Sequence, residues 1–363
     1  MVTGESRPIR KGPGDRLWQG SLNRYGRLRL RVDAVGEDAT VRKLLRLAEA
    51  ARARKAPVVR LADRWAERLV PAALLLAFLT GAILLWMGFP WCVAIRRAVA
   101  ILVTFCPCAL ALATPTAIYA AISRTAKEGV LVKSGQALET AAALKTICFD
   151  KTGTLTSSTW GNRLRRDADG RILDTQARGD DPIRPEAPAA LASLRTLGIR
   201  TVLLSGDAPE AVQTVARACA IEDARDSLLP EDKLRLVEQI AAREAPLAFV
   251  GDGINDAAAM SRANLGIAMA GSGTDVAAEA ADIALLRDNL DALPALVRLA
   301  RRTLSVIRFN LATAILINLF ALSACAGGHI GPIGGAFLHN AGSLLVVLNA
   351  ARLARRRQDA NNH

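Results

Sequence analysis

Aromatic residues are scarce in this 363-residue chain: Phe, Trp and Tyr make up 4% of it, although the formal net charge is +13. A basic protein that binds single-stranded nucleic acid usually interleaves its cations with rings that stack on bases. Here the basic residues are mostly arginines that are scattered or flank apolar runs. We therefore expect no nucleic-acid partner, and we expect the arginines to anchor the cytosolic side of a membrane.

Cysteine is also infrequent, with six residues in the chain, of which Cys106 and Cys108 lie inside an apolar run. Two cysteines at this spacing in a helix do not readily close a disulfide, so no disulfide framework is expected. Residues 1–10 contain no apolar core, and we expect no signal peptide there.

Long apolar runs are what the chain has instead, in keeping with its mean hydropathy of +0.23. A run of about 20 apolar residues can span the hydrocarbon core of a bilayer. We therefore expect an α-helical membrane bundle of about four spans, with Arg96 and Arg97 interrupting the sequence between the first two. The runs are residues 69–91, 98–122, 311–326 and 333–348. The basic residues 352–357 are expected in the cytosol.

The segment between the second and third runs is typical of a soluble α/β domain. Short apolar stretches of strand type alternate with amphipathic helical stretches, which favours a Rossmann-type parallel sheet covered by helices. The predicted strands are 145–149, 200–204, 246–250 and 265–269, and the predicted helices include 186–197 and 232–243. Ligands of such sheets bind at the carboxyl ends of the strands. Earlier in the chain, strand material is expected at 21–35 and an amphipathic helix at 40–54.

A carboxylate stands at the end of the first predicted strand. Asp150 can act as a nucleophile there. The residues that follow it are Lys151, Thr152, Gly153 and Thr154. Their charge, hydroxyls and backbone N–H groups can surround a transferred phosphoryl group. An ordinary turn after a strand also contains Asp, Thr and Gly, so this motif alone leaves both interpretations open.

Three more polar clusters follow later strand ends. They are Ser205-Gly206-Asp207, then Lys233 after Pro230-Glu231-Asp232, and finally Gly251-Asp252-Gly253-Ile254-Asn255-Asp256. Asp252 and Asp256 can hold Mg²⁺ against a phosphate. Lys233 can neutralise phosphate charge, and the Ser205 hydroxyl can hydrogen-bond an oxygen. Taken alone, the two aspartates could belong to a loop and a helix N-cap. Four such clusters in one sheet favour a phosphate site.

The second apolar run contains Cys106-Pro107-Cys108. A proline frees backbone carbonyls in a membrane helix. Thiolates beside freed carbonyls suit a soft metal ion such as Cu(I) or Zn(II). The alternative is two small hydrophobic residues that pack at a proline kink, and the motif alone leaves both open.

Polar residues interrupt the last two apolar runs. Asn318, His339 and Ser343 are among them. Polar side chains in membrane helices can line a transport pathway, in which His339 would be a metal ligand. They can also hydrogen-bond between helices, and both interpretations stay open here.

Three motifs then resemble those of one family. Asp-Lys-Thr-Gly-Thr-Leu-Thr at 150–156, Gly-Asp-Gly-Ile-Asn-Asp at 251–256 and Thr-Gly-Glu at 3–5 resemble a P-type ATPase. The Cys-Pro-Cys motif is similar to that of the heavy-metal-transporting branch, and the resemblance covers almost the whole chain. It implies a haloacid-dehalogenase-like sheet domain and ATP-driven translocation of a transition-metal cation across a membrane. Asp150 would be the phosphorylated residue.

The resemblance also implies a role for each site residue. The implied catalytic residues are Asp150, Lys151, Thr152, Thr154, Ser205 in place of the family's Thr, Gly206, Asp207, Lys233 and Glu5. The implied Mg²⁺ residues are Asp150, Thr152 and Asp252, with Asn255 and Asp256 completing their loop. The implied transport-site residues are Cys106, Cys108, Asn318, His339 and Ser343.

The same resemblance implies ATP and Mg²⁺ as cofactors and Cu⁺, Zn²⁺ or Cd²⁺ as the transported ion. It implies the lipid bilayer and a metallochaperone as partners, and a multi-pass protein of a bacterial cell membrane with cytoplasmic soluble domains. Thr152 stands where related phosphatases carry a second acid. No general acid or base is then expected beside the phosphoaspartate, so its hydrolysis waits for Glu5 to position a water molecule.

The chain also departs from the family's pattern. Only residues 157–183 separate the Asp150 motif from Arg184, where the family places a nucleotide-binding domain, and this segment is typical of a linker. We find no His-Pro dipeptide to match the family's adenine site. The expected domains are a partial actuator domain at 1–62, two spans at 63–123, a phosphorylation domain at 124–300, two spans at 301–351 and a tail at 352–363. We therefore expect a truncated pump that lacks its early spans and the first half of the actuator domain.

Two other functions remain open at this point. One is a membrane-tethered phosphatase of the haloacid-dehalogenase type, and the other is an inactive pump remnant that binds metal. The metal is open as well. Copper pumps are expected to carry a Tyr-Asn pair where this chain has Ile317-Asn318, and zinc and cadmium pumps an aspartate in the last span, where none lies between Ile330 and Arg352.

Overall fold

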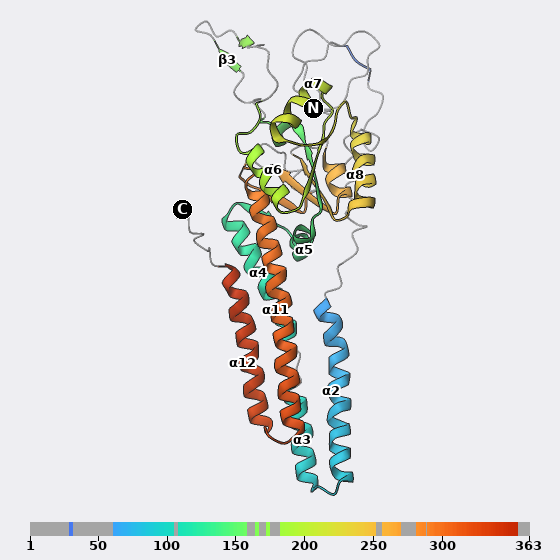
Figure 1. Ribbon diagram of the computed structural model, residues 1–363, viewed down its shortest axis with the longest axis vertical. Helices are drawn as coiled ribbons and strands as arrows, with labels where there is room; N and C mark the ends of the chain where they lie inside the picture. Colours follow the sequence, from blue (N-terminus) through green and yellow to red (C-terminus); the bar gives the residue numbers. More distant parts are fainter. Residues whose placement is uncertain are drawn as a thin grey trace. The chain divides into compact units, whose positions relative to one another are not determined.

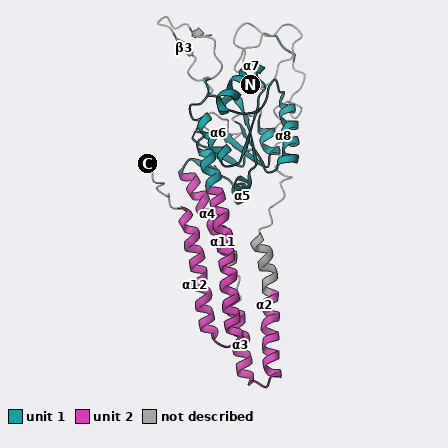
Figure 2. Cartoon of the chain, in the orientation of Figure 1, with its two compact units in different colours: residues 1–56, 128–298 teal, residues 57–127, 299–363 magenta. Residues whose placement is uncertain are grey.

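The computed structural model describes residues 29–31, 61–104, 108–157, 164–166, 172–174, 182–251, 256–269, 281–287 and 289–354. The chain divides into two compact units, residues 1–56 with 128–298 and residues 57–127 with 299–363 (Figure 2). The strand expected at 21–35 and the helix expected at 40–54 lie outside the described residues, except for 29–31, which form neither helix nor strand.

A seven-stranded sheet forms the centre of the first unit, with helices on both sides (Figure 1). The strand order is β1-β9-β8-β7-β2-β5-β6, and every neighbouring pair is parallel except β1 and β9. The strands are β1 Val130–Val132, β2 Thr146–Asp150, β5 Arg200–Leu204, β6 Asp223–Arg225, β7 Leu247–Gly251, β8 Leu265–Met269 and β9 Ile283–Leu285. After β2, the chain adds β5 and β6 on one side and then β7 on the other, so a topological switch point lies beside β2.

The central strands form because their residues are apolar on both faces. Every residue of β2, β7 and β8 is buried, as expected for parallel strands covered on both sides. On one face, Cys148, Val202 and Phe249 pack in a core cluster with α8 (Pro230–Glu244) and α9 (Ala257–Arg262). This core holds the carboxyl ends of β2, β5 and β7 in fixed register.

The four predicted central strands are confirmed to within one residue at each end. The helices predicted at 186–197 and 232–243 are confirmed as α6 (Ala187–Thr196) and α8. The other helices described in this unit, besides α9, are α5 (Gly135–Ala143) and α7 (Pro209–Cys219). The sequence did not predict β1, β6 and β9, because strands of three residues are too short to show a period.

The segment predicted as a linker is not entirely without secondary structure. Two short strands, β3 (Leu164–Arg166) and β4 (Ile172–Asp174), pair antiparallel as a hairpin within it. The sequence did not predict this hairpin, because backbone pairing across a turn needs no apolar face that a sequence pattern would reveal, and the role of the segment as a linker stays a prediction.

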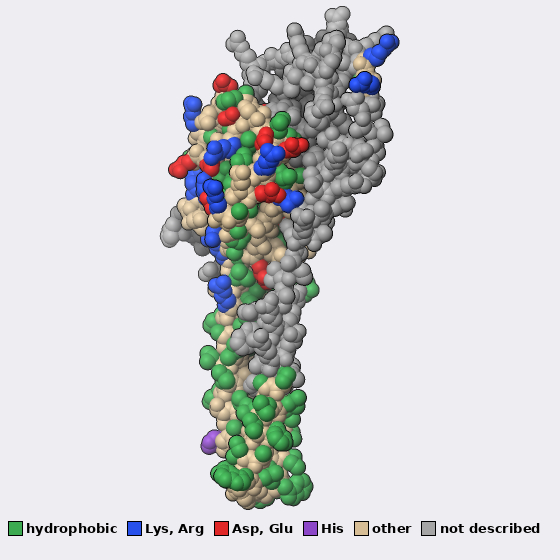
Figure 3. Space-filling view, turned by 90° about the vertical axis from the view of Figure 1, so that its right-hand side faces the viewer, with side chains coloured by type: hydrophobic (Ala, Val, Ile, Leu, Met, Phe, Trp, Pro, Cys, Tyr) green, Lys and Arg blue, Asp and Glu red, His purple; other side chains and the backbone are tan. Residues whose placement is uncertain are grey.

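The second unit consists of helices. They are α2 (Leu61–Trp86), α3 (Trp91–Thr104), α4 (Cys108–Lys127), α11 (Ala292–Ala326), whose first residues belong to the other unit, α12 (Pro332–Ala351) and the short η5 (Arg352–Ala354). Two segments, Ala292–Ala326 and Pro332–Ala354, are long and apolar enough to cross a membrane. The part of α2 from Pro71 to Trp86 is also apolar but shorter. Figure 3 shows that hydrophobic side chains cover much of the helical surface. The number of four spans stays a prediction.

Two boundaries in this unit differ from those predicted. The first apolar run was expected to continue to residue 91, but α2 ends at Trp86, because Gly88 adopts a left-handed φ of +81° and Pro90 follows it. Arg97, which interrupts the apolar sequence as predicted, lies inside α3, so this helix begins before the second apolar run. Arg97 Nη1 donates to the Ala326 carbonyl at 3.1 Å, so the guanidinium caps the end of α11.

Gly335 of α12 lies against Thr104 of α3 and Cys325 of α11. A Cβ atom at this position would lie 2.2 Å from Thr104 Oγ1 and 3.3 Å from Cys325 Sγ. Both of these side chains are fully buried, so neither has open space into which it could move. Small residues at such contacts let membrane helices pack closely.

We predict that Gly335→Ala lowers the midpoint of thermal unfolding in detergent by several degrees, since overpacking costs about 1–3 kcal/mol. Thr104→Ala in the same chain should restore most of the loss, because it removes the clashing hydroxyl. Gly331→Ala is the control, as a Cβ there meets no atom within 4 Å. Equal midpoints for Gly335→Ala and Gly331→Ala would contradict the prediction.

Candidate functional site

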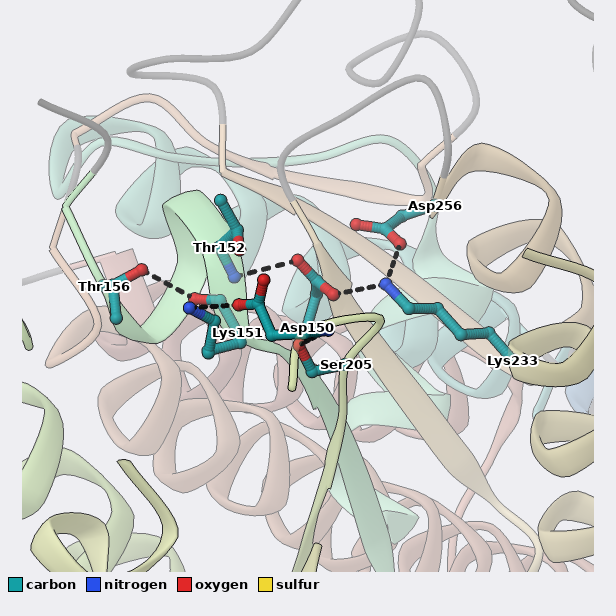
Figure 4. A network of polar contacts seen from close by, with 8 residues as sticks. Asp150, Lys151, Thr152, Thr156, Ser205, Lys233 and Asp256 are labelled. Atoms are coloured by element: carbon teal, nitrogen blue, oxygen red, sulfur yellow. Dashed lines mark hydrogen bonds and ion pairs between the residues drawn. The ribbon is translucent and has the colours of Figure 1, made fainter. Parts of the chain in front are cut away.

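Asp150 is the last residue of β2 and is 5% exposed. Its Oδ2 accepts a hydrogen bond of 3.1 Å from the Thr152 backbone N–H (Figure 4). The loop that follows, Lys151–Leu155, is a single wide turn in which Gly153 has a left-handed φ of +73°. The strand and the turn therefore fix the carboxylate at the carboxyl end of β2, where the sequence places it, and its role as a nucleophile stays a prediction.

Lys233 lies in the first turn of α8 and supplies the positive charge opposite Asp150. Its Nζ is 2.5 Å from Asp150 Oδ1 and 3.4 Å from Asp256 Oδ1 (Figure 4). Burial by itself would lower the pKa of Lys233, but the two carboxylates outweigh burial, so the pKa is raised. Lys233 is therefore a permanent cation at neutral pH.

Asp256 occupies the N-cap position of α9, but its side chain makes no capping hydrogen bond. Its carboxylate faces Lys233 instead, at 2% exposure of the residue. Gly251, at the end of β7, makes this possible: a Cβ there would lie 2.7 Å from Asp256 Oδ2. The geometry favours the functional interpretation of Asp256 over the N-cap interpretation.

The turn after β5 brings a second ion pair to the site. Asp207 Oδ2 pairs with the buried Nζ of Lys151. The Ser205 Oγ, also buried, accepts a 3.2 Å hydrogen bond from the Asp207 N–H across Gly206. Ser205 thus shapes the turn that presents Asp207, while its own hydroxyl proton stays available as a donor.

The threonines of the loop divide into two kinds. Thr154 is fully buried, and its Oγ1 finds no hydrogen-bond partner within the part of the chain that the structure describes. A buried hydroxyl without a partner is costly, and an incoming phosphoryl oxygen would satisfy it. Thr156, which the sequence analysis did not select, donates from Oγ1 to the Lys151 carbonyl at 3.1 Å and so closes the turn.

Two carboxylates of the site could contribute to binding a divalent cation. Asp150 and Asp256 are buried and both contact Lys233 Nζ, whereas the half-buried Asp207 pairs with Lys151. Carboxylate oxygens are the ligands that Mg²⁺ prefers. Of the residues predicted for Mg²⁺, the structure describes Asp150, Thr152 and Asp256, and their role in holding the ion stays a prediction.

Several predicted site residues lie outside what the structure describes. They are Glu5, Cys106, Asp252 and Asn255, together with the side chain of Cys108, whose backbone begins α4. Residues 105–107, where the sequence predicts that proline interrupts the helix, also lie outside the described residues. The metal-ligand roles of the two cysteines stay predictions.

The polar residues of the last two helices do not form a metal site by themselves. No group of three or more His, Cys, Asp or Glu side chains that could hold an ion occurs among the described residues. His339 is buried on α12, its backbone carbonyl accepts from the Ser343 hydroxyl at 3.1 Å, and Asn318 is half-buried. Asn349 Nδ2 donates to Asn310 Oδ1 at 2.7 Å, so inter-helix hydrogen bonding does occur between α12 and α11.

Two family models match the chain. The model of haloacid dehalogenase-like hydrolases matches residues 162–264, and the model of the P-type ATPase actuator domain matches residues 1–49. The first match includes Ser205, Lys233 and Asp256 of the cluster described above.

The chain is similar to curated metal-transporting proteins along nearly its whole length. It is 34% identical to a copper-exporting P-type ATPase of Mycobacterium tuberculosis, over 97% of this chain and 58% of the relative. It is 33% identical to a manganese-exporting P-type ATPase of Mycobacterium bovis, over 99% of this chain and 63% of the relative. The chain therefore spans about six tenths of the length of these relatives.

A solved structure shares the fold. The crystal structure of a zinc-transporting PIB-type ATPase in an E2.Pi state superposes with a TM-score of 0.76 at 29% identity, covering 89% of this chain and 68% of that one. The match to the copper-exporting P-type ATPase of Mycobacterium tuberculosis extends over 444 positions, whereas this chain has 363 residues. That relative therefore contains additional residues within the matched region.

Proposed function

We propose that this chain, which belongs to the family of heavy-metal P-type ATPases, couples phosphorylation of Asp150 by ATP to the movement of a transition-metal ion across a membrane. The observation that carries the proposal is the buried Asp150–Lys233–Asp256 cluster at the carboxyl ends of β2 and β7. A nucleophilic carboxylate, a permanent cation and a second carboxylate are the parts that phosphoryl transfer to an aspartate needs.

The residues would divide the work of phosphoryl transfer. A carboxylate oxygen of Asp150 attacks the terminal phosphorus, and the phosphorus–oxygen bond to ADP breaks. Lys233 lies beside the reacting carboxylate and would stabilise charge on the transferred group. The Thr152 N–H would orient the Asp150 carboxylate, and the Thr154 hydroxyl would accommodate a phosphoryl oxygen. Bound Mg²⁺ would supply further charge neutralisation, held by Asp150 and Asp256.

Release of the phosphoryl group would depend on another part of the chain. Among the named residues around Asp150, Lys151 is committed to Asp207 and Thr152 is no acid. Glu5 lies within the match to the actuator domain and is our candidate for positioning the hydrolytic water. This separation would let the phosphorylated state persist long enough to control metal access in the membrane.

The metal would be bound by Cys106 and Cys108, in the segment of the sequence that joins α3 to α4. We propose a soft ion, Cu⁺, Zn²⁺ or Cd²⁺, as the substrate, because thiolates select such ions. The soluble parts would face the cytoplasm of a bacterial cell, where a metallochaperone could deliver the ion. The different metals named for the relatives leave the choice among these ions to experiment.

The test is acid-stable labelling of the purified chain, separately with [γ-³²P]ATP and with [³²P]phosphate. We expect Mg²⁺-dependent label from both donors, and we expect label from ATP to increase when Cu⁺, Zn²⁺ or Cd²⁺ is added. Cys106→Ser should remove the metal effect and leave label from phosphate. Label from phosphate alone, at any ATP concentration up to the millimolar range, would contradict the use of ATP.

A further inference from the structure

Arg184 is a buried arginine that the mechanism above does not use. The residue is only 5% exposed, and it follows directly after the segment 157–183. Burying a guanidinium costs several kcal/mol in lost hydration unless acceptors hold it. An arginine in such a position is therefore expected to bind something that fixes its place.

The contacts of Arg184 reach the turn that follows Asp150. Its Nη2 donates to the Gly153 carbonyl at 2.8 Å, and its backbone N–H donates to the Leu155 carbonyl at 2.9 Å. Next to it, Ile183 pairs with Thr156 in an isolated antiparallel bridge. The two ends of the segment 157–183 therefore lie side by side, because Thr156 pairs with Ile183. From this pair the Arg184 side chain extends to the turn.

Gly153 has no side chain, so its backbone is the least restrained of the turn. It has a φ of +73°, in the left-handed region. In a trans peptide, the carbonyl of one residue and the N–H of the next point to opposite sides. The hydrogen bond from Arg184 to the Gly153 carbonyl therefore determines the side to which the Thr154 N–H points.

We infer that Arg184 is a positioning residue for phosphoryl transfer to Asp150. Its guanidinium holds the Gly153–Thr154 peptide in the one orientation that presents the turn's N–H groups to the phosphoryl oxygens. Because its hydrogen bonds go to the backbone of the turn, Arg184 acts through that turn. The inference rests on the proposed function, since it takes Asp150 as the residue that is phosphorylated.

The test compares Arg184→Met, Arg184→Lys and Arg184→Ala with the wild-type chain. We expect Arg184→Met to lower the maximal rate of Asp150 labelling about tenfold to hundredfold, as loss of a supporting hydrogen bond commonly does. The half-saturating concentrations of ATP and phosphate should change little. Arg184→Lys should recover part of the rate, and low millimolar guanidinium should recover part of it in Arg184→Ala.

Arg195→Met is the matched control. Arg195 also donates to backbone carbonyls, those of Cys219 and Ala220, at 2.9 and 3.0 Å in the same unit. Its replacement should leave the labelling rate unchanged. An equal loss in Arg195→Met, an unchanged rate in Arg184→Met, or a change confined to the half-saturating concentrations would overturn the inference.

Amide hydrogen exchange of the peptide that contains residues 150–157 gives a readout without a phosphoryl donor. We expect faster exchange in Arg184→Met than in the wild type or in Arg195→Met. Unchanged exchange overturns the positioning role whatever the labelling shows. If the wild-type chain shows no label at Asp150 but exchange still depends on Arg184, the proposed function is wrong. The role of Arg184 in phosphoryl transfer is then wrong as well.

Discussion

Asp150→Asn is expected to abolish acid-stable labelling by both ATP and phosphate, to below about one thousandth of the wild-type level, since a covalent intermediate cannot form without its nucleophile. The amide is nearly isosteric with the carboxylate. The hydrogen bond from the Thr152 N–H to the side-chain oxygen at position 150 can therefore persist, and the fold should be retained. The measurement is the amount of ³²P that survives acid precipitation, together with thermal unfolding of the same preparation.

The control for the Asp150 variant is Glu210→Gln, which removes an exposed carboxylate in the first turn of α7. It should label as the wild type does. Label that persists in Asp150→Asn at the wild-type level would show that another residue accepts the phosphoryl group, and the proposed mechanism would then be wrong.

Lys233→Met is expected to have the second-largest effect, because it removes the cation that pairs with two buried carboxylates. Removing one partner of a buried ion pair costs about 3–5 kcal/mol of stability. Loss of a group that stabilises charge in the transition state lowers a rate about 10²- to 10³-fold. Both effects should appear together, as a lower free energy of unfolding and a slower labelling of Asp150.

Lys233→Arg serves as the second variant if Lys233→Met does not fold, since it keeps the charge but not the shape of the ammonium. It should retain more stability than the methionine variant and still label slowly. Lys145→Met, at an exposed position before β2, is the control for the loss of a lysine. Wild-type labelling by either Lys233 variant would contradict the role given to Lys233.

The pH dependence follows from the raised pKa of Lys233, which lies above its ordinary value of 10.5. A cation with a raised pKa in the folded state contributes stability that is fully present below the unfolded pKa and is lost as pH rises through the folded one. The difference in unfolding free energy between the wild type and Lys233→Met should therefore stay constant between about pH 6 and 9. A decrease between pH 7 and 9 would show that Lys233 deprotonates there.

Much of the sheet could be predicted because its central strands are continuous apolar runs. Strands β2, β5, β7 and β8 are buried along almost their whole length, and such runs are visible in a linear sequence. Strand β6, with the residues Asp-Ala-Arg, carries no apolar pattern and pairs only because β5 lies beside it. Its existence depends on a neighbour, which local sequence does not reveal.

The site was predictable in its chemistry but not in its pairings. Asp150, Lys233 and Asp256 were selected because each follows or faces a strand end with a residue type that suits phosphate or Mg²⁺. The partnership of Lys151 with Asp207 and the hydrogen bond from Arg184 to Gly153 were not predicted. In the sequence, Arg184 is only the residue that follows the predicted linker, and its burial is visible only in the tertiary structure.

The sequence by itself predicted the family resemblance, the apolar strands and Asp150 as the candidate phosphorylated residue, because these predictions depend on local order and composition. Only the tertiary structure decided which lysine pairs with which aspartate. Lys233 lies 83 residues from Asp150 along the chain, and their atoms meet because parallel crossovers bring the carboxyl ends of β2, β5 and β7 to one edge of the sheet. Sequence spacing carries no information about such contacts, since they are set by strand order and by the packing of α8 against the sheet.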